Sequence, residues 1–330
     1  MSKARVIKFD RHGDPSVLKL RDVEVPDPPP GHVRINVQAV GLNRAEINFR
    51  NGTTATPKFP STIGYEAAGM IDAVGEGVAG FACGDRVAVL PSQSMEVYGT
   101  YAELLNYPAD MIVKMPAEQS FVEAAATWMQ YLTAYALVDP AGVQAGDHVL
   151  ITAASSSVGM AAIQIANARG AIPIALTSRP EKVEPLLRHG AAHAFVTSDN
   201  DWTEAVMRQC SGQGPRVVFD AVGEKLIPAL MGVIRTGGVL VNYGILSGGT
   251  MSIAAAAAIG KELTLYFYTT RRVFRETERK RQALAFITDG LQTGELVPVI
   301  DRTFPFAEVA DAHAYLERGA GLGKVVLTVP

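Results

Sequence analysis

The sequence predicts an α/β fold in which a doubly wound parallel sheet is inserted into a β-rich domain. With 330 residues the chain is too long for one compact core, so two domains are expected. Up to about Ala117, short alternating runs are separated by turns rich in glycine and proline, as in a small barrel or folded sheet. After Pro116, apolar strands alternate regularly with helices, which favours a parallel sheet covered on both faces.

The N-terminal strands are predicted from short runs in which apolar and polar residues alternate. Turn clusters such as residues 26–31 and 75–77 bound these runs, because proline and glycine favour turns over strand interiors. The strands predicted in this region are Arg5–Phe9, His32–Val40, Ala67–Val74, Asp85–Leu90 and Ala102–Leu105.

The middle of the chain begins with residues of good helix propensity over Glu123–Tyr135, where we predict one helix. Strands and helices then alternate, and right-handed crossovers are expected between the parallel strands. The predicted strands are His148–Ala153, Ile172–Thr177, Ala194–Thr197, Val217–Asp220 and Gly238–Tyr243, and the predicted helices are Val158–Arg169, Glu181–His189, Trp202–Gln209 and Lys225–Ile234.

The last sixty or so residues follow a different pattern. They predict a long charged helix over Arg271–Gly290, a short strand over Val297–Asp301, a helix over Ala307–Arg318 and a closing strand over Lys324–Val329. We expect this tail to rejoin the N-terminal β-rich domain.

The composition excludes several classes of protein. Hydrophobic residues make up 48% and charged residues 19%, as in a soluble globular enzyme. The net charge of −3 gives no reason to expect a nucleic-acid or anionic-membrane partner. No signal-peptide stretch is seen, and the apolar run Met251–Ile259 is too short to span a bilayer. Two cysteines cannot form a disulfide framework. We therefore expect a cytoplasmic protein.

The turn after the strand at His148 predicts a dinucleotide site. Small residues here permit a tight turn and a close approach of backbone to pyrophosphate, and the following helix offers free N–H groups. Ala154, Ser156 and Gly159 stand at the three glycine places of the usual fingerprint, so the strict motif fails. A turn of small residues without a ligand is the alternative. The residues expected to hold the phosphates are Ser155, Ser156, Ser157, Val158 and Gly159.

The end of the second strand of this sheet predicts the choice of cofactor. NAD-binding domains place an acidic residue there to bind the ribose hydroxyls. Here the residues are Thr177, Ser178 and Arg179, followed by Lys182. A hydroxyl and two cations suit a 2′-phosphate, which predicts NADPH over NADH. The alternative, that both cations only solvate a helix start, is weakened because they oppose the helix dipole.

Several segments in order resemble the medium-chain dehydrogenase/reductase superfamily, and most closely its zinc-free quinone-oxidoreductase branch. The resemblance covers essentially the whole chain and is highly specific for the superfamily. Its segments are Gly41–Asn43, Gly64–Gly69, Val74–Val78, Phe81–Val87, Glu123–Ala126, Ala153–Gly159, Val218–Gly223 and Gly323–Leu327.

This resemblance implies a Rossmann domain inserted into a GroES-like catalytic domain, with the active site in the cleft between them. The implied domains are residues 1–122 and 269–330 for the catalytic domain and 123–268 for the NADP-binding Rossmann domain. Relatives commonly form homodimers by pairing Rossmann edge strands, and the β-prone segment Leu263–Tyr268 resembles that strand.

The resemblance also bears on zinc. Asn43 stands where zinc-dependent relatives have a cysteine, and Tyr65 stands where they have a histidine; neither is a good zinc ligand. Cys83 is the only cysteine of the N-terminal domain, so the structural-zinc lobe is missing. No pair of the six histidines has ligand spacing, and most are expected at the surface or at strand ends. We therefore expect neither a catalytic nor a structural zinc.

Without a Lewis acid, alcohol oxidation loses its means of stabilising an alkoxide, and hydride addition to a quinone or an α,β-unsaturated carbonyl fits better. A small electron-poor substrate is therefore expected. Asn43, Tyr65 and Arg44 are the candidate catalytic residues. Asn43 resembles an asparagine beside the nicotinamide ribose, or it satisfies a turn. The Tyr65 hydroxyl donates to the substrate oxygen, or its ring fills the space of a zinc site. Arg44 contacts substrate or cofactor, or it is a surface cation.

Further cofactor contacts follow from the resemblance and from the rule that ligands bind at the carboxyl ends of parallel strands. Met95, Tyr98 and Tyr101 line an apolar pocket or pack in the core. The remaining cofactor-binding candidates are Asn43, Thr127, Val222, Tyr243, Gly244, Phe267 and Lys324.

Two other functions stay open at this point. One is a non-catalytic NADPH-binding or redox-sensing protein, which would share the nucleotide-binding features and differ in turnover. The other is an alcohol dehydrogenase with an atypical metal site built from substitute ligands.

Overall fold

The computed structural model describes residues 2–91 and 94–330 and divides into two compact units. The first unit comprises Met1–Met129 and Pro298–Pro330, and the second comprises Gln130–Val297. The second unit is thus inserted in sequence between two parts of the first, which confirms the predicted insertion of a parallel-sheet domain into a β-rich one.

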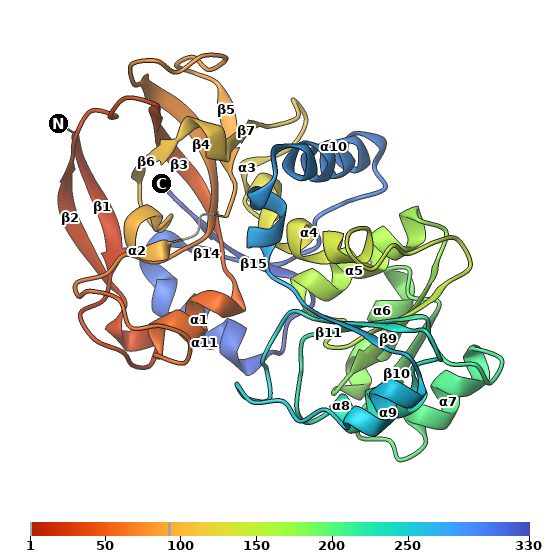
Figure 1. The fold of residues 1–330 in the computed structure, drawn as a ribbon. Helices are drawn as coiled ribbons and strands as arrows, with labels where there is room; N and C mark the ends of the chain where they lie inside the picture. The colour runs from red at the N-terminus through yellow and green to blue at the C-terminus, as the bar shows by residue number, and fades with distance from the viewer. Residues whose placement is uncertain (1, 92–93) are drawn as a thin grey trace. The chain divides into compact units, whose positions relative to one another are not determined.

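A sheet of seven strands supports the first unit within the described residues, in the order β14-β15-β3-β4-β5-β7, with β6 also paired to β3 (Figure 1). Its pairs are antiparallel except β14 with β15. A separate hairpin joins β1 (Ser2–Lys8) to β2 (Lys19–Val25). The strands of the large sheet are β3 (His32–Gly41), β4 (Glu66–Val74), β5 (Arg86–Val89), β6 (Leu104–Pro108), β7 (Ile112–Lys114), β14 (Ile300–Pro305) and β15 (Lys324–Thr328).

The tail of the chain completes this sheet, as predicted. Strand β15 pairs with β3, with Leu327 opposite Val40, and both side chains lie in one apolar core. Helices and short 3-10 turns cover the sheet and join its strands. They are η1 (Pro15–Val17), α1 (Arg44–Arg50), α2 (Met95–Tyr98), η2 (Ala109–Met111), α3 (Phe121–Ala124), η6 (Phe306–Glu308) and α11 (Val309–Arg318).

The second unit is built on a parallel sheet of order β10-β9-β8-β11-β12-β13. The chain order reverses between β8 and β11, which is the point where doubly wound folds bind nucleotides. Its strands are β8 (His148–Ile151), β9 (Ile172–Thr177), β10 (His193–Val196), β11 (Val217–Asp220), β12 (Val239–Asn242) and β13 (Thr264–Phe267).

Helices cover both faces of this sheet (Figure 1). Helices α7 and α8 bury apolar side chains against one face, in a core that includes Leu150, Val206 and Leu230, and α5 packs against β8 and β9. The helices and 3-10 turns are α4 (Trp128–Ala134, beginning in the first unit), η3 (Tyr135–Leu137), α5 (Ser157–Ala168), η4 (Pro180–Lys182), α6 (Val183–Arg188), α7 (Trp202–Gln209), α8 (Ile227–Val233), α9 (Ala255–Gly260), η5 (Thr270–Arg275) and α10 (Thr277–Thr293).

The single helix predicted over Glu123–Tyr135 is wrong, because the chain forms α3 and α4 with a break between them. The Met129 N–H donates to Glu66 Oε2 at 3.0 Å instead of continuing a helical ladder. The carbonyl of Ala125 lies so close to Gly41 that a Cβ there would sit 2.0 Å away. A buried carboxylate and a close backbone contact therefore override helix propensity.

Residues 269–297 pack within the second unit, whereas the sequence analysis grouped them with the catalytic domain. Arg279 Nε donates to Asp139 at 2.8 Å, and the rings of Tyr135 and Phe286 lie 5.7 Å apart. No helix in the described part of the chain has both the length and the apolar character needed to cross a membrane.

Candidate active site

The turn between β8 and α5 has the tight geometry that its small residues predicted. Ala153 adopts a left-handed backbone with φ of 46°, one residue before the first expected fingerprint position. The Ser156 hydroxyl accepts the Gly159 N–H at 3.1 Å and caps α5. A Cβ at Gly159 would lie 2.5 Å from the Ala154 carbonyl oxygen, so only glycine permits this packing. The twelve-residue α5 therefore begins beside a compact turn, as a phosphate site requires.

A lysine from η4, which follows β9, reaches this turn. Lys182 is buried, and its Nζ donates to Ser155 Oγ at 3.1 Å. Thr177 Oγ1 accepts the Arg179 N–H at 3.2 Å, which shapes the chain between them. Ser178 is exposed at the same end of the strand. The structure thus brings together Ser155 and Lys182, which the sequence analysis predicted separately.

A buried carboxylate ties three neighbouring strand ends of the second unit together. Asp220 Oδ1 accepts from Thr152 Oγ1 at 2.7 Å and from the Val222 N–H at 3.0 Å. Its Oδ2 accepts from the Gly223 N–H at 2.9 Å and from Asn242 Nδ2 at 3.0 Å. Of these residues only Val222 was a predicted cofactor contact; Asp220, Thr152 and Asn242 were not predicted, although polar residues at the ends of apolar strands were the available signal.

Four other predicted cofactor residues lie at the carboxyl edge of the parallel sheet. The Tyr243 ring stacks on Phe219 with centroids 4.2 Å apart, and burial raises the pKa of the Tyr243 hydroxyl. A Cβ at Gly244 would lie 2.7 Å from the Ala221 carbonyl oxygen. Phe267 ends β13 with 68% of its surface exposed. Val222 lies in the turn that Asp220 holds.

A buried polar cluster in the first unit surrounds Asn43. This residue follows β3 and precedes α1, and its Oδ1 accepts from Lys324 Nζ at 2.7 Å. Its Nδ2 donates to Glu66 Oε1 at 3.2 Å. Lys324 and Glu66 form an ion pair with almost no exposed surface. Asn43 and Lys324, two predicted cofactor residues from opposite ends of the chain, therefore share one cluster.

Glu46 lies in the same cluster and has no exposed surface. Its carboxylate accepts the Asn43 N–H at 2.7 Å, the Tyr65 N–H at 3.0 Å and the Tyr101 hydroxyl at 2.6 Å. Burial raises the pKa of Glu46 to about 7, against the lowering effect of the hydrogen bonds from Tyr101 and Asn43. Glu46 was not among the predicted site residues, since a glutamate three residues into a helix is an ordinary capping residue.

His313 is fully buried, as an exception to the expectation that most histidines lie at the surface or at strand ends. Its Nε2 lies 3.1 Å from the Tyr101 hydroxyl, and its Nδ1 lies 3.0 Å from Arg50 Nη1. Burial, with Arg50 adding to it, lowers the pKa of His313 to about 3. Arg50 also pairs with Glu317. The helical position of His313 gave no sign of these contacts.

The remaining predicted residues of the first unit lie in different surroundings. Tyr65 is half-buried and packs against the apolar core, and Arg44 is exposed. Thr127 is buried, and its hydroxyl donates to the Glu123 carbonyl at 2.7 Å. Of the three candidate catalytic residues, Asn43 thus contributes its side chain to the buried cluster, and Tyr65 contributes its backbone N–H, which donates to Glu46.

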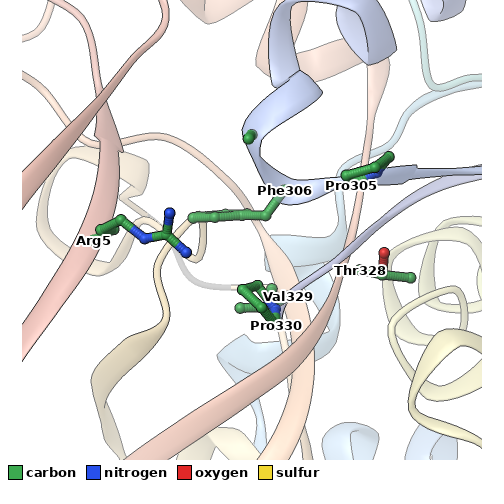
Figure 2. A pocket seen from close by; sticks show the side chains of 7 residues that line it. Arg5, Pro305, Phe306, Thr328, Val329 and Pro330 are labelled. Atoms are coloured by element: carbon green, nitrogen blue, oxygen red, sulfur yellow. The ribbon is translucent and has the colours of Figure 1, made fainter.

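A cavity of about 250 Å³ lies elsewhere in the first unit (Figure 2). Arg5 at its edge is paired with Glu103, with Nε donating at 2.8 Å. None of the predicted site residues lines it, so we do not place the active site there. Its lining residues are Arg5, Pro305, Phe306, Ala307, Thr328, Val329 and Pro330.

Metal-ligating side chains do not gather in threes anywhere in residues 2–91 and 94–330. In the cluster around Asn43, the cationic partner of Glu66 is the Lys324 ammonium.

Comparison with known proteins identifies the family of this chain. A family model described as an alcohol dehydrogenase GroES-like domain matches residues 29–117, and one described as a zinc-binding dehydrogenase matches residues 189–327. The human quinone oxidoreductase is 33% identical to this chain, over 99% of this chain and 97% of that protein.

Solved structures give the same result. The Escherichia coli quinone oxidoreductase in complex with NADPH superposes with a TM-score of 0.91 at 28% identity, covering 98% of this chain and 99% of that one. A protein described as an NAD-dependent alcohol dehydrogenase superposes with a TM-score of 0.89 at 31% identity, covering 99% of this chain and 100% of that one. The chain is therefore an oxidoreductase that belongs to the quinone-oxidoreductase-like branch of the medium-chain dehydrogenase/reductase superfamily.

Proposed function

We propose that this oxidoreductase uses NADPH, without zinc, to transfer hydride to quinones or to α,β-unsaturated carbonyl compounds. The observation that carries the proposal is the Asn43–Lys324–Glu66 cluster, in which the buried cation is a lysine ammonium. The names of the human and Escherichia coli relatives, which are quinone oxidoreductases, support the substrate class.

The preference for NADPH rests on the second unit. The β8–α5 turn suits a pyrophosphate, and Lys182 with Ser178 and Arg179 suits a 2′-phosphate. The residues that directly follow β9, Ser178 and Arg179, are not acidic, so neither takes the place of the acid that binds the ribose hydroxyls in NAD-binding domains. Glu181 comes next in η4, where its carboxylate lies 3.6 Å from Arg179. The NADPH complex of the Escherichia coli relative supports this choice. The similar structure described as NAD-dependent makes the NADH comparison an essential part of the test.

The donor set around Asn43 does not fit zinc. Zinc prefers thiolate, imidazole and carboxylate ligands, and here an amide and a tyrosine replace two of them. Glu66 already accepts from Lys324, Asn43 and the Met129 N–H. A divalent cation would have to displace a buried ammonium from this cluster.

The chemistry then depends on positioning. NADPH supplies the hydride when it is bound. As hydride reaches a conjugated acceptor, negative charge develops on the acceptor oxygen, which hydrogen-bond donors stabilise and solvent protonates. We assign the Tyr65 hydroxyl as a donor to that oxygen and Asn43, fixed by Lys324 and Glu66, as a contact of the nicotinamide ribose. Arg44, which is exposed beside Asn43, is assigned to the polar end of the substrate.

We also infer a homodimer formed through the parallel sheets. Strand β13 (Thr264–Phe267) is the last strand of its sheet, so its outer backbone groups can pair with a second copy. The β-prone sequence of this strand favours such pairing. Sedimentation velocity tests the inference, and a monomer at micromolar concentration contradicts it.

The function is tested by following NADPH oxidation, with NADH alongside, against quinones, enones and simple aldehydes after chelator treatment. We expect turnover with NADPH and the conjugated acceptors, no loss after chelation, and little turnover with simple aldehydes. Loss of activity on chelation that returns with zinc would contradict zinc independence. Tight NADPH binding without turnover of any acceptor would favour a binding protein instead.

A further inference from the structure

The carboxylate of Glu46 joins Asn43, at the start of its own helix, to two segments that are distant in the sequence, at Tyr65 and Tyr101. Its Oε2 accepts the Asn43 N–H at 2.7 Å and the Tyr101 hydroxyl at 2.6 Å. Its Oε1 accepts Asn43 Nδ2 at 3.1 Å and the Tyr65 N–H at 3.0 Å. All four contacts are donors, so they occupy the acceptor sites of an ionised carboxylate. Both oxygens therefore connect Asn43 to a second segment of the first unit.

Helix capping alone does not account for this arrangement. Glu123 occupies the same position in α3, where it accepts from the Ser120 N–H at 2.8 Å and from the Ser120 hydroxyl at 2.6 Å. Its contacts thus stay within its own turn, near the surface. Glu46 makes the equivalent contact with Asn43 and, in addition, binds Tyr65 and Tyr101 from other segments.

The contacts behind Glu46 fix the direction of the Tyr101 hydroxyl. The Arg50 guanidinium can only donate, so His313 Nδ1 accepts its N–H at 3.0 Å. Neutral His313 then carries its proton on Nε2 and donates to the Tyr101 oxygen at 3.1 Å. The Tyr101 proton is thereby directed at Glu46. This chain of donors begins at a buried cation and ends at the carboxylate, which stabilises the anionic form of Glu46.

We propose that Glu46 is a positioning residue of the active site, whose ionised carboxylate fixes Asn43 and the backbone of Tyr65 relative to each other. The inference rests on the proposed function, because that function gives Asn43 and Tyr65 their roles. Protonation of Glu46 turns one acceptor into a donor and releases at least one of the four contacts. Protonation of Glu46 therefore weakens the arrangement of Asn43 and Tyr65.

The arrangement predicts that kcat decreases at low pH, which gives the pH profile of the rate an acid limb. Burial raises the pKa of Glu46 to about 7, so its charged fraction falls as pH drops below about 7, and the rate falls with it. The titratable and charged groups that surround Glu46, directly or through Tyr101, are Tyr101, Tyr65, Lys324, Glu66, His313 and Arg50.

The first test is Glu46→Gln, which keeps the shape of the side chain but replaces one acceptor oxygen by a donor. Since displacing a reacting contact by about 1 Å can lower a rate about 100-fold, we expect kcat to fall about 10- to 100-fold. The KM for NADPH should rise by a smaller factor than kcat falls, because only the Asn43 contact with the nicotinamide ribose is disturbed and the phosphate site lies in the other unit. The acid limb should disappear. Glu123→Gln is the matched control and should keep the wild-type kcat and pH profile.

The second test is Tyr101→Phe, which removes one donor to Glu46 and leaves the carboxylate in place. Loss of that hydrogen bond should move the acid limb to higher pH, because the Tyr101 hydroxyl lowers the pKa of Glu46. A purely structural role for Glu46 would lower activity without moving the limb. If Glu46→Gln does not fold, the pH shift of the acid limb in Tyr101→Phe tests the proposal. An acid limb at the wild-type pH in Tyr101→Phe then overturns it.

Hydrogen–deuterium exchange gives a readout that needs no turnover. The Asn43 and Tyr65 amides donate to Glu46, so peptides that contain them should exchange at least about tenfold faster in Glu46→Gln and at wild-type rates in Glu123→Gln. Unchanged exchange overturns the proposal even where no acceptor is turned over. An active wild type with an equally active Glu46→Gln variant also overturns it, whereas a wild type without turnover counts against the proposed function alone.

Discussion

Ala153 shows how one residue adapts the nucleotide turn without the usual glycine. Its φ of 46° lies in the left-handed region, which costs a residue with a Cβ about 1 kcal/mol or more. Serine replaces glycine at position 156, but there its hydroxyl caps α5, so the replacement is useful rather than strained. The strain of this turn is therefore concentrated at a single alanine.

Replacement of that alanine should stabilise the protein. We expect Ala153→Gly to raise the free energy of unfolding by about 0.5 kcal/mol, since the relief of backbone strain exceeds the added entropy of an unfolded glycine. Urea denaturation followed by circular dichroism measures the change. Ala154→Gly is the control, because Ala154 is fully buried without a positive φ, and it should destabilise. Equal destabilisation by both changes would contradict the strain argument.

His313 should make stability depend on pH in a defined direction. Burial lowers the pKa of His313 to about 3 from an ordinary 6.5. Between pH 3 and pH 6.5 the histidine is therefore protonated in the unfolded chain but neutral in the folded chain. The contribution of His313 to the free energy of unfolding is therefore greatest above pH 6.5. It decreases as pH falls below 6.5, by up to about 1.4 kcal/mol per pH unit. Glu46, with a raised pKa, acts in the opposite direction between its ordinary value and about 7.

The comparison of wild type with His313→Gln separates the two groups. Glutamine can accept from Arg50 and donate to Tyr101 as the neutral imidazole does, but it does not titrate. We expect the free energy of unfolding of the wild type to decline relative to the variant as pH falls from 6.5 to 5. Parallel pH profiles would show that His313 does not titrate in this way. Denaturant unfolding at several pH values provides the measurement.

Strands and helices were predicted best where the local pattern of apolar residues is enough to determine their bounds. Strands β9 and β11 and helix α7 have the predicted bounds, because apolar runs or a clear helical period specify each one. The predicted helix over Glu123–Tyr135 failed because Glu66, distant in the sequence, takes the Met129 N–H. Local propensity carries no information about such a partner.

The Glu66–Lys324 pair holds β4 and β15 together and also anchors the start of α4. Breaking a buried pair costs about 3–5 kcal/mol, because the remaining charge is left without a partner. We therefore expect Glu66→Gln to lower the free energy of unfolding by about 3 kcal/mol. The double variant with Lys324→Met should recover at least about half of that loss, since no unpaired ammonium remains. Additive losses in urea denaturation would contradict a coupled pair.

For the whole molecule, the order of motifs along the chain was enough to predict the inserted domain and the parallel sheet. The candidate site was predicted only in part. Motif positions pointed to Asn43, Lys324, Ser155 and Lys182, but not to the contacts that join them. Glu46 and His313 escaped prediction because their roles arise from buried contacts between segments far apart in the sequence, and a capping glutamate or a helical histidine looks ordinary by itself.

Lys182 links the cofactor to the stability of the molecule, since a ligand that binds only the folded state stabilises it. At 100 times its dissociation constant, NADPH should stabilise the wild type by about 2.7 kcal/mol. Lys182→Met removes a charge-assisted contact of about 2 kcal/mol, or about 30-fold in affinity, so at the same concentration only about 0.9 kcal/mol should remain. Stabilisation by NADH should be the same in both proteins, because NADH has no 2′-phosphate. Lys280→Met, on α10, should behave as wild type. Thermal unfolding with each nucleotide measures the effect, and equal NADPH stabilisation of wild type and Lys182→Met would show that Lys182 does not hold the phosphate.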